Sequence, residues 1–449
     1  MAEILTPTKA LTVNPLKASQ PIGASLAFLG IADCMPLEHG ARGCTSFNKL
    51  FFMRHFNEPI ALQTTAMDQT TTVLGADDNV VEALATICAK NAPKVIGLVT
   101  TGLSEMQGAD VPRTVKEFRQ KHPEFADVAV VPVSASDTLG CLETGFATAV
   151  ESIIATLVPS HPSGWKNRRQ VNVLASSALS PGDLEELRAW IEAFGLTPIL
   201  LPDIGASLDG HLIEQGFSTL TYGGVTREEI ESMADSGATL VIGRSMSRAA
   251  DALQTRTGAS DFRFDQLIGL QACDAFTQVL TEISGRPAPQ HFARKRAQLT
   301  DAMVDCQFQF GGAKIGVAGD GDLLSSLVDF FHGMGAHVVA AVASARACRL
   351  ADLPIEEVVV GDLEDLEILS REREADLIVT NSHGAEISRR TGAAFLRAGF
   401  PIYDSYGAHS DPWIGYGGTR RLIFAAANLL AAHYQELRPY VSKYKQAAE

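Results

Sequence analysis

Short runs of apolar and β-branched residues alternate with longer amphipathic stretches along most of this chain, and this alternation restricts its fold the most. Residues 95–99, 171–174 and 314–318 are three such runs, and a stretch with helical periodicity follows each of them. Strands that are separated by helices pair in parallel sheets covered by helices. We therefore predict an α/β fold of three Rossmann-like parallel-sheet domains.

The length of 449 residues also requires several domains, since one hydrophobic core serves roughly 100–200 residues. Residues 159–164 (PSHPSG) combine two prolines, a glycine and small polar residues, which is typical of a linker. We predict an N-terminal α/β domain at 1–164, a second Rossmann-like domain with linking helices at 165–305, and a third with a C-terminal helix at 306–449.

The charge balance excludes several classes of partner. Lysine and arginine number 37 against 52 acidic residues, for a formal net charge of −15. Such a chain repels nucleic acids and anionic membranes. Residues 422–434 are the most apolar late stretch, but Asn428 and His433 interrupt it, so we expect a buried helix there. The first twenty residues contain no apolar signal segment, so we expect no export.

The cysteine pattern argues against a disulfide framework. The seven cysteines are odd in number, scattered and never spaced as C-x-x-C: Cys34, Cys44, Cys88, Cys141, Cys273, Cys306 and Cys348. This usage is typical of the reducing cytoplasm. No stretch holds four close thiolates, so another chain would have to complete any metal cluster. We expect Cys34, Cys88, Cys273 and Cys348 to be packed core residues.

Cys44 carries the strongest chemical signal. Gly40 and Gly43 free the backbone just before it, and residues 45–55 can continue as a helix. A cysteine at a helix N-terminus near Arg42 is expected to have a lowered pKa, which suits a nucleophile or metal ligand. From these residues alone, a buried structural thiol is an equally good interpretation.

Two polar segments and one histidine carry weaker chemical signals. Gly319-Asp320-Gly321-Asp322 lies between a predicted strand and helix, but Leu324 replaces the third glycine of a dinucleotide fingerprint. We interpret it as a tight turn whose carboxylates complement the helix dipole. Residues 380–384 (TNSHG) follow a predicted strand and either line an interdomain cleft or cap a loop. His39 either orients a nearby ligand or stabilises a turn by a hydrogen bond.

Several segments resemble the β subunit of nitrogenase component 1. They are residues 17–24 (KASQPIGA), 39–44 (HGARGC) and 54–59 (RHFNEP), followed by 381–384, 399–404 and 415–418. The similarity runs from about Lys17 to Leu430. Within this superfamily, residues 64–75 and 404–408 are similar to the N-type branch, whose members take part in biosynthesis of the iron–molybdenum cofactor.

The resemblance also assigns cluster ligands. The catalytic β subunit supplies three cysteines to an eight-iron cluster, and the matching positions here are Ser19, Cys44 and Gly102. One remaining thiolate can complete a four-iron cluster whose other three ligands come from a partner. The resemblance thus implies that Cys44 binds an iron of a [4Fe–4S] cluster shared between two subunits.

The implied function is that of an assembly scaffold and not of an enzyme by itself, although limited reductase activity of the complex stays open. Two such chains would join two E-type chains in a heterotetramer, the E-type partner would carry most of the cofactor precursor, and the nitrogenase iron protein would bind transiently. Two alternatives remain. One is a catalytic β-like subunit of nitrogenase or of dark-operative protochlorophyllide reductase. The other is a cytoplasmic protein that binds a metal or small ligand.

Overall fold

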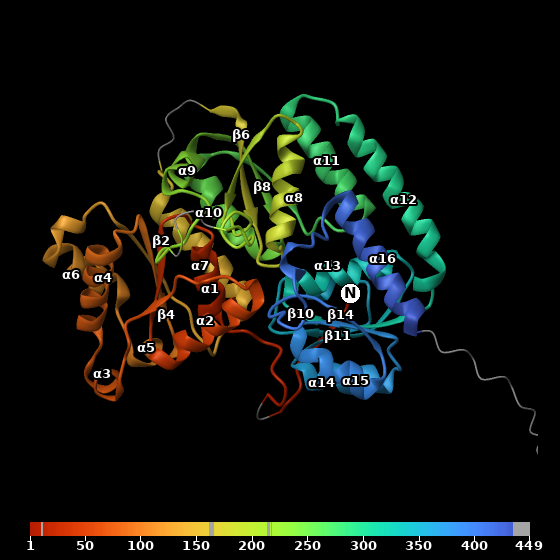
Figure 1. The fold of residues 1–449 in the computed structure, drawn as a ribbon, viewed down its shortest axis with the longest axis horizontal. Helices are drawn as coiled ribbons and strands as arrows, with labels where there is room; N and C mark the ends of the chain where they lie inside the picture. Colours follow the sequence, from red (N-terminus) through yellow and green to blue (C-terminus); the bar gives the residue numbers. More distant parts are fainter. Residues whose placement is uncertain (10–11, 161–165, 213–215, 217, 434–449) are drawn as a thin grey trace, which may run out of the picture.

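Three parallel sheets organise the computed structural model, which describes residues 1–9, 12–160, 166–212, 216 and 218–433 (Figure 1). Every strand pairing within these sheets is parallel. The α/β architecture of three parallel sheets expected from the sequence is therefore confirmed, since helices alternate with the strands along the chain.

The first sheet has the order β3-β2-β4-β5. Its strands are β2 (Cys34–His39), β3 (Gln63–Thr64), β4 (Val95–Thr100) and β5 (Ala129–Val133). The helices of this unit are α1 (Gln20–Leu29), α2 (Arg42–Phe56), α3 (Gln69–Leu74), α4 (Asp77–Asn91), α5 (Gly102–Gln107), α6 (Val111–Lys121) and α7 (Leu142–Leu157). Both β2 and β4 are buried throughout, as expected of strands covered on two faces.

The second sheet has the order β7-β6-β8-β9. Its strands are β6 (Asn167–Ala175), β7 (Thr197–Leu201), β8 (Ser236–Ile242) and β9 (Ser260–Phe264), and its helices are α8 (Pro181–Glu192), α9 (Arg227–Ser232), α10 (Ser247–Thr257), α11 (Leu270–Ser284) and α12 (Gln290–Phe310). Capping boxes begin α8 at Ser180 and α9 at Thr226. Helix α9 is short, because β8 already begins at Ser236.

The third sheet has the order β1-β12-β11-β10-β13-β14. Its strands are β1 (Glu3–Leu5), β10 (Lys314–Gly319), β11 (His337–Ala343), β12 (Glu357–Val360), β13 (Leu377–Thr380) and β14 (Ala394–Arg397). The helices are α13 (Gly321–Gly333), α14 (Leu363–Glu372), α15 (Ala385–Thr391) and α16 (Gly415–His433). The expected buried C-terminal helix is α16, and Tyr434 lies outside the described residues.

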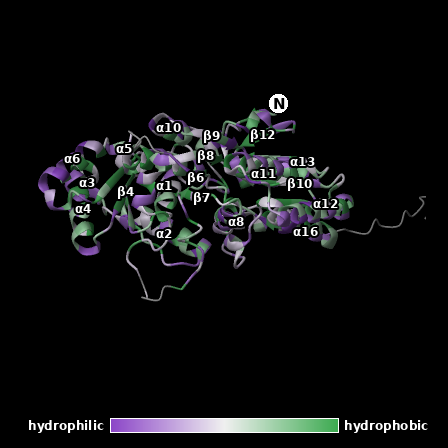
Figure 2. Cartoon of the chain, turned by 90° about the horizontal axis from the view of Figure 1, so that it is seen from above, coloured by the Kyte–Doolittle hydropathy of each residue, from purple (hydrophilic) through white to green (hydrophobic). Residues whose placement is uncertain are grey.

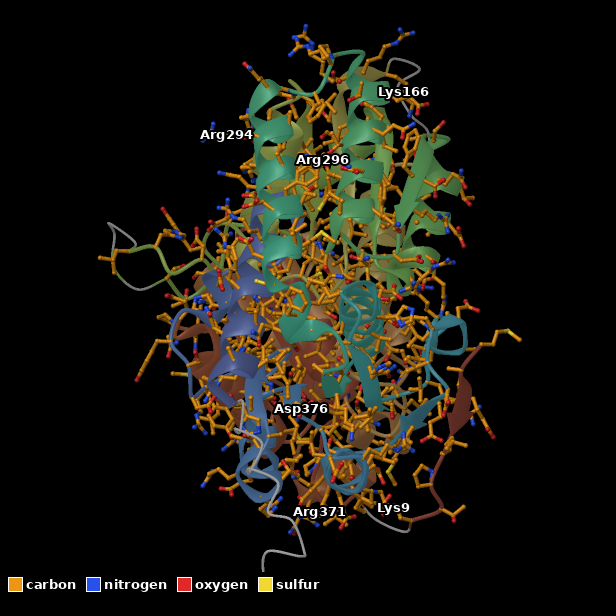
Figure 3. All side chains as sticks on the ribbon, turned by 90° about the vertical axis from the view of Figure 1, so that its right-hand side faces the viewer. Lys9, Lys166, Arg294, Arg296, Arg371 and Asp376 are labelled. Atoms are coloured by element: carbon orange, nitrogen blue, oxygen red, sulfur yellow. The ribbon has the colours of Figure 1, made fainter. Side chains whose placement is uncertain are left out.

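The N-terminal strand joins the third sheet although it begins the chain. Glu3, Ile4 and Leu5 pair with β12, and the ammonium group of Lys9 lies 2.7 Å from Asp362 and 2.9 Å from Asp365 (Lys9 is labelled in Figure 3). The predicted boundary at 164/165 falls within residues 161–165, outside the described part. The three domain limits therefore stay predictions.

Hydropathy follows this layout, with hydrophobic strands lying between helices whose outer faces are hydrophilic (Figure 2). No helix in the described part of the chain is long and apolar enough to cross a membrane. A large cluster of buried residues runs through all three sheets, from Phe28 in α1 to Trp190 in α8 and Phe331 in α13. The units thus share one continuous core.

Buried carboxylates lie where the three units meet. Glu143 at the start of α7 accepts a hydrogen bond from the backbone N–H of Asp322 at 2.7 Å, while Asp322 accepts from the hydroxyl of Ser245 at 2.6 Å. Asp320 in turn accepts from the backbone N–H of Glu143 at 3.3 Å. Burial raises the pKa of all three acids, and the carboxylates of Asp322 and Asp320 raise that of Glu143 further. The side chain of Asp320 does not cap α13, and the carboxylates of the turn at 319–322 instead accept hydrogen bonds from the other two units, which joins the three units.

Two glycines let α1 and α7 pack with their backbones in contact. A Cβ atom at Gly23 would lie 1.8 Å from the carbonyl oxygen of Leu142, and one at Gly145 would lie 2.0 Å from that of Gln20. Both distances are far below van der Waals contact, so neither position tolerates a side chain without separation of the helices. This packing fixes the start of α1 next to the start of α7.

We expect Gly23→Ala to destabilise the fold by about 1–3 kcal/mol or more, because overpacking against backbone atoms cannot be relieved by a rotamer change. Thermal unfolding of the purified protein measures the effect. Gly43→Ala is the matched control, since a Cβ atom at Gly43 meets nothing within 4 Å. Equal melting temperatures for both variants would contradict the packing argument.

Candidate functional site

Three helix starts meet at the carboxyl-terminal edge of the first sheet. Ser19 is the N-cap residue of α1, Cys44 lies in the first turn of α2, and Gly102 is the first residue of α5. Strands β2 and β4 are parallel neighbours, so the chain leaves both at the same edge, just before Cys44 and Gly102. The hydroxyl group of Thr101 donates to the carbonyl of His39 at 2.9 Å and links the two exits.

The loop after β5 joins these helix starts. The side-chain oxygen of Gln20, beside Ser19, accepts the backbone N–H of Ser136 at 3.0 Å. The next residue, Asp137, accepts the backbone N–H of Gly102 at 2.8 Å. Asp137 also acts electrostatically on Cys44. The three positions predicted from the sequence are therefore gathered around one loop.

Cys44 is exposed, which rules out the interpretation as a buried structural thiol. The expected lowering of its pKa was wrong for the chain alone. Partial desolvation raises the pKa of this thiol, and the carboxylates of Asp137 and Glu38 raise it further. Desolvation and these two acids together outweigh the lowering effect of the backbone N–H at the start of α2. A bound metal reverses this balance, because coordination by a cation deprotonates a thiol.

Glu38 was missed by the sequence interpretation. Its Oε1 atom accepts hydrogen bonds from the hydroxyl of Ser25 in α1 at 2.9 Å and from the amide of Asn48 in α2 at 2.8 Å. The residue is fully buried, and burial raises the pKa of its carboxyl group. Glu38 thereby fixes both helix starts on β2. The sequence signal that points to Glu38 is an acidic residue within a mostly apolar strand.

Exposed apolar side chains lie on α2 and on α3, α5 and the loop after β5 in the same unit as Cys44. Phe47 and Leu50 follow it on α2 at helical spacing and are 65% and 47% exposed. Helices α3 and α5 lie beside each other, since the side chain of Gln107 donates to the carbonyl of Thr71 at 2.6 Å (Figure 1). They add further exposed apolar side chains, and the loop after β5 adds one more: Val73, Leu74, Met106 and Leu139. We call these six residues the Cys44 face.

The burial of the remaining cysteines differs from the prediction at one position. Cys34, Cys88 and Cys273 are buried, as predicted, whereas Cys348 is exposed and its assignment to the core was wrong. Its alanine-rich surroundings belong to the loop between β11 and β12 and not to a helix. Among the described residues no other cysteine is exposed besides Cys44 and Cys348.

The structure also shows the surroundings of the two weaker polar candidates, His39 and Asn381. His39 is buried, and its Nδ1 atom lies 2.9 Å from the hydroxyl oxygen of Thr65, which favours the hydrogen-bonding interpretation. Burial lowers the pKa of His39 to about 4. Asn381 both caps a turn, by accepting the backbone N–H of His383 at 3.1 Å, and lines a cleft between the domains.

Among the described residues at this edge, Cys44 is the one exposed thiol that could bind a metal. Within the described ranges, no group of three or more histidine, cysteine or acidic residues is arranged to bind a metal ion. A four-iron cluster needs about four ligands, usually thiolates. Cys44 can supply one of them at an exposed apolar surface, where a second chain can supply the others.

Comparison with known proteins assigns this chain to a family. The model of the nitrogenase component 1 type oxidoreductases matches residues 19–431. The nitrogenase iron-molybdenum cofactor biosynthesis protein NifN of Klebsiella pneumoniae is 43% identical over all of this chain and 97% of its own length. The NifN protein of Bradyrhizobium diazoefficiens is 45% identical over 97% of this chain and 93% of its own.

Solved structures agree with these matches. A chain of nitrogenase Cp1 at pH 6.5 superposes with a TM-score of 0.89 at 30% identity, over 98% of both chains. A chain of the same nitrogenase at pH 5 has a TM-score of 0.71 at 15% identity, which indicates a shared fold alone.

Proposed function

The chain belongs to the nitrogenase component 1 type oxidoreductase family, within its NifN branch of iron–molybdenum cofactor biosynthesis proteins, and from this premise we propose a specific role. The chain acts as a scaffold subunit that pairs with an E-type subunit and supplies one ligand, Cys44, to a [4Fe–4S] cluster shared between them. Two chains of each type form the assembly. The partner carries most of the cofactor precursor, and the nitrogenase iron protein binds transiently.

One observation carries this proposal: three helix starts converge, and only one of them bears a thiol. Ser19 and Gly102 lie beside the same loop as Cys44 but offer no sulfur. Half of an eight-iron cluster needs about three thiolates from one chain, whereas one corner of a four-iron cluster needs a single thiolate. The site therefore supports a shared four-iron cluster better than a catalytic β-type cluster.

The Cys44 face supports the pairing. Its six apolar residues form a surface of the kind that marks a protein interface. A partner that covers them removes water from around Cys44 and brings its own ligands close. Burial of apolar side chains stabilises the pair, and the cluster bonds add to it.

The residues of this chain have distinct roles in the proposed site. Cys44 binds one iron as a thiolate, and Glu38 positions the start of α2 through Asn48. Asp137 keeps the start of α5 in place through the N–H of Gly102. When bound, the cluster supplies a one-electron redox centre between the subunits.

Anaerobic purification after co-expression with the E-type partner, in a host without other nitrogen-fixation proteins, tests the proposal. We expect about four iron atoms per heterodimer, as one shared cluster requires. About eight irons in a single centre, or dinitrogen reduction with the iron protein, would favour the catalytic alternative. A stable monomer without iron, unaffected by the partner, would favour the small-ligand-binding alternative.

A further inference from the structure

The start of α5 carries a carboxylate at the position where the β-type cluster pattern has a cysteine. Gly102 is the first residue of this helix, and its backbone N–H donates to Oδ2 of Asp137 at 2.8 Å. A Cβ atom at Gly102 would lie 3.0 Å from the same oxygen and 3.5 Å from the Cβ atom of Asp137. The first distance is shorter than ordinary van der Waals contact, so a side chain at position 102 would displace the carboxylate. Asp137 thus takes the side of the helix start from which a cysteine at position 102 would project.

The charge of Asp137 reaches the thiol of Cys44. Partial desolvation is the largest cause of the raised pKa of Cys44, and Asp137 has the larger effect of the two acids that add to it. The other acid, Glu38, is buried, and burial raises the pKa of its carboxyl group, which favours the neutral form. Asp137 is exposed, and exposed carboxylates carry a negative charge at neutral pH. Of these two acids, Asp137 is therefore the one whose charge persists beside Cys44.

No cation of the described part of the chain neutralises this charge. The carboxylate of Asp137 accepts one hydrogen bond there, from Gly102, and it forms no ion pair with a described lysine, arginine or histidine. The loop that carries it is fixed, since the backbone N–H of Ser136 donates to the side-chain oxygen of Gln20 at 3.0 Å. A partner that covers the Cys44 face removes water from this edge, and charge interactions strengthen where water is excluded.

We propose that Asp137 lowers the reduction potential of the [4Fe–4S] cluster, an inference that rests on the proposed function of Cys44. Reduction adds one electron, and so one negative charge, to such a cluster. The electron comes from a one-electron donor of low potential, for which dithionite substitutes in vitro. A carboxylate beside the cluster opposes the added charge and favours the oxidised form, because net charge is one of the factors that set the potential of an iron–sulfur cluster.

Asp137 acts through its charge and does not bind iron in this proposal. Cys44 and three thiolates of the partner already provide one ligand for each of the four irons. The consequence for the assembly is that the reduced cluster gives up its electron more readily than it would beside a neutral side chain.

Redox titration of the anaerobically purified, co-expressed complex with dithionite tests the proposal, with the spin signal of the reduced cluster as the readout. Asp137→Asn removes the charge, while its amide oxygen can still accept from the N–H of Gly102. We expect this variant to raise the ratio of reduced to oxidised cluster about tenfold at a given potential, which corresponds to a midpoint potential about 59 mV higher. Asp137→Glu keeps the charge and should retain a midpoint potential closer to that of the original chain.

Asp127→Asn is the matched control. Asp127 is exposed and precedes β5, whereas Asp137 follows this strand, so the two acids lie at opposite edges of the first sheet. The control removes the same charge and should leave the midpoint potential unchanged. Iron content should be the same in every variant, because no ligand is altered.

The outcomes separate this proposal from the one on Cys44. An original complex without a four-iron signal would overturn both. With the cluster present, an unchanged or lower potential in Asp137→Asn, or an equal rise in Asp127→Asn, would overturn the role of Asp137 alone. Loss of iron from Asp137→Asn would identify Asp137 as a ligand and would also overturn that role.

Discussion

Replacing Cys44 with alanine is expected to abolish or convert the four-iron signal in electron paramagnetic resonance and to remove up to about four irons per heterodimer, because a cluster left with three thiolates is open to loss. Cys44 is the one exposed thiol among the described residues of the first unit, since Cys34, Cys88 and Cys141 are buried. The side chain is exposed, so the substitution leaves no core cavity in this chain. Iron analysis and the spin signal of the anaerobic complex measure the result.

Two cysteines provide matched controls for this prediction. Cys348→Ala removes the second exposed thiol and should leave both iron content and signal intact. Cys88→Ala removes a buried thiol, so it should lower stability slightly without affecting the cluster. If Cys44→Ala retained full iron content and an unchanged signal, Cys44 would not be a ligand.

Introducing a charge on the Cys44 face is expected to separate the subunits. Phe47 lies one helical turn after Cys44 and is 65% exposed, so Phe47→Glu does not disturb the core. In a complex the carboxylate would be buried without a partner, which we expect to weaken pairing by about 2 kcal/mol or more, or roughly thirtyfold. Sedimentation velocity of the co-expressed chains measures the fraction that remains paired.

The control for this variant is Ile368→Glu, which places the same charge on a half-exposed apolar position of α14, in the third unit. We expect it to pair normally. Equal pairing of Phe47→Glu and the original chain would show that the Cys44 face is not the contact surface. Expressed without a partner, the original chain should aggregate through this face.

Local chemistry along the chain was enough to predict many elements. The apolar runs at 95–99, 171–174 and 314–318 lie within β4, β6 and β10, because each is a short apolar segment that a turn and a helix follow. The capping boxes at Ser180 and Thr226 involve side chains only three positions apart, so the sequence shows them directly. The helix predicted to continue after Cys44 is α2, although it already begins at Arg42, so that Gly43 lies in its first turn. Edge strands β1 and β14 were missed, because their few half-buried residues lack a strong pattern.

Only the tertiary structure decided the chemical environment of the proposed sites. The pKa of Cys44 rises because the fold partly removes its thiol from water and brings the charges of Asp137 and Glu38 near it, and neither effect is visible as a local pattern. The exposure of Cys348 likewise depends on which face of the third unit its loop covers. The cleft that Asn381 lines exists because three domains pack together around it. The sequence by itself determined which side chains and which helix starts are present. Long-range packing determined which groups lie next to each side chain, and these neighbours set its burial, its charge state and its exposure to solvent.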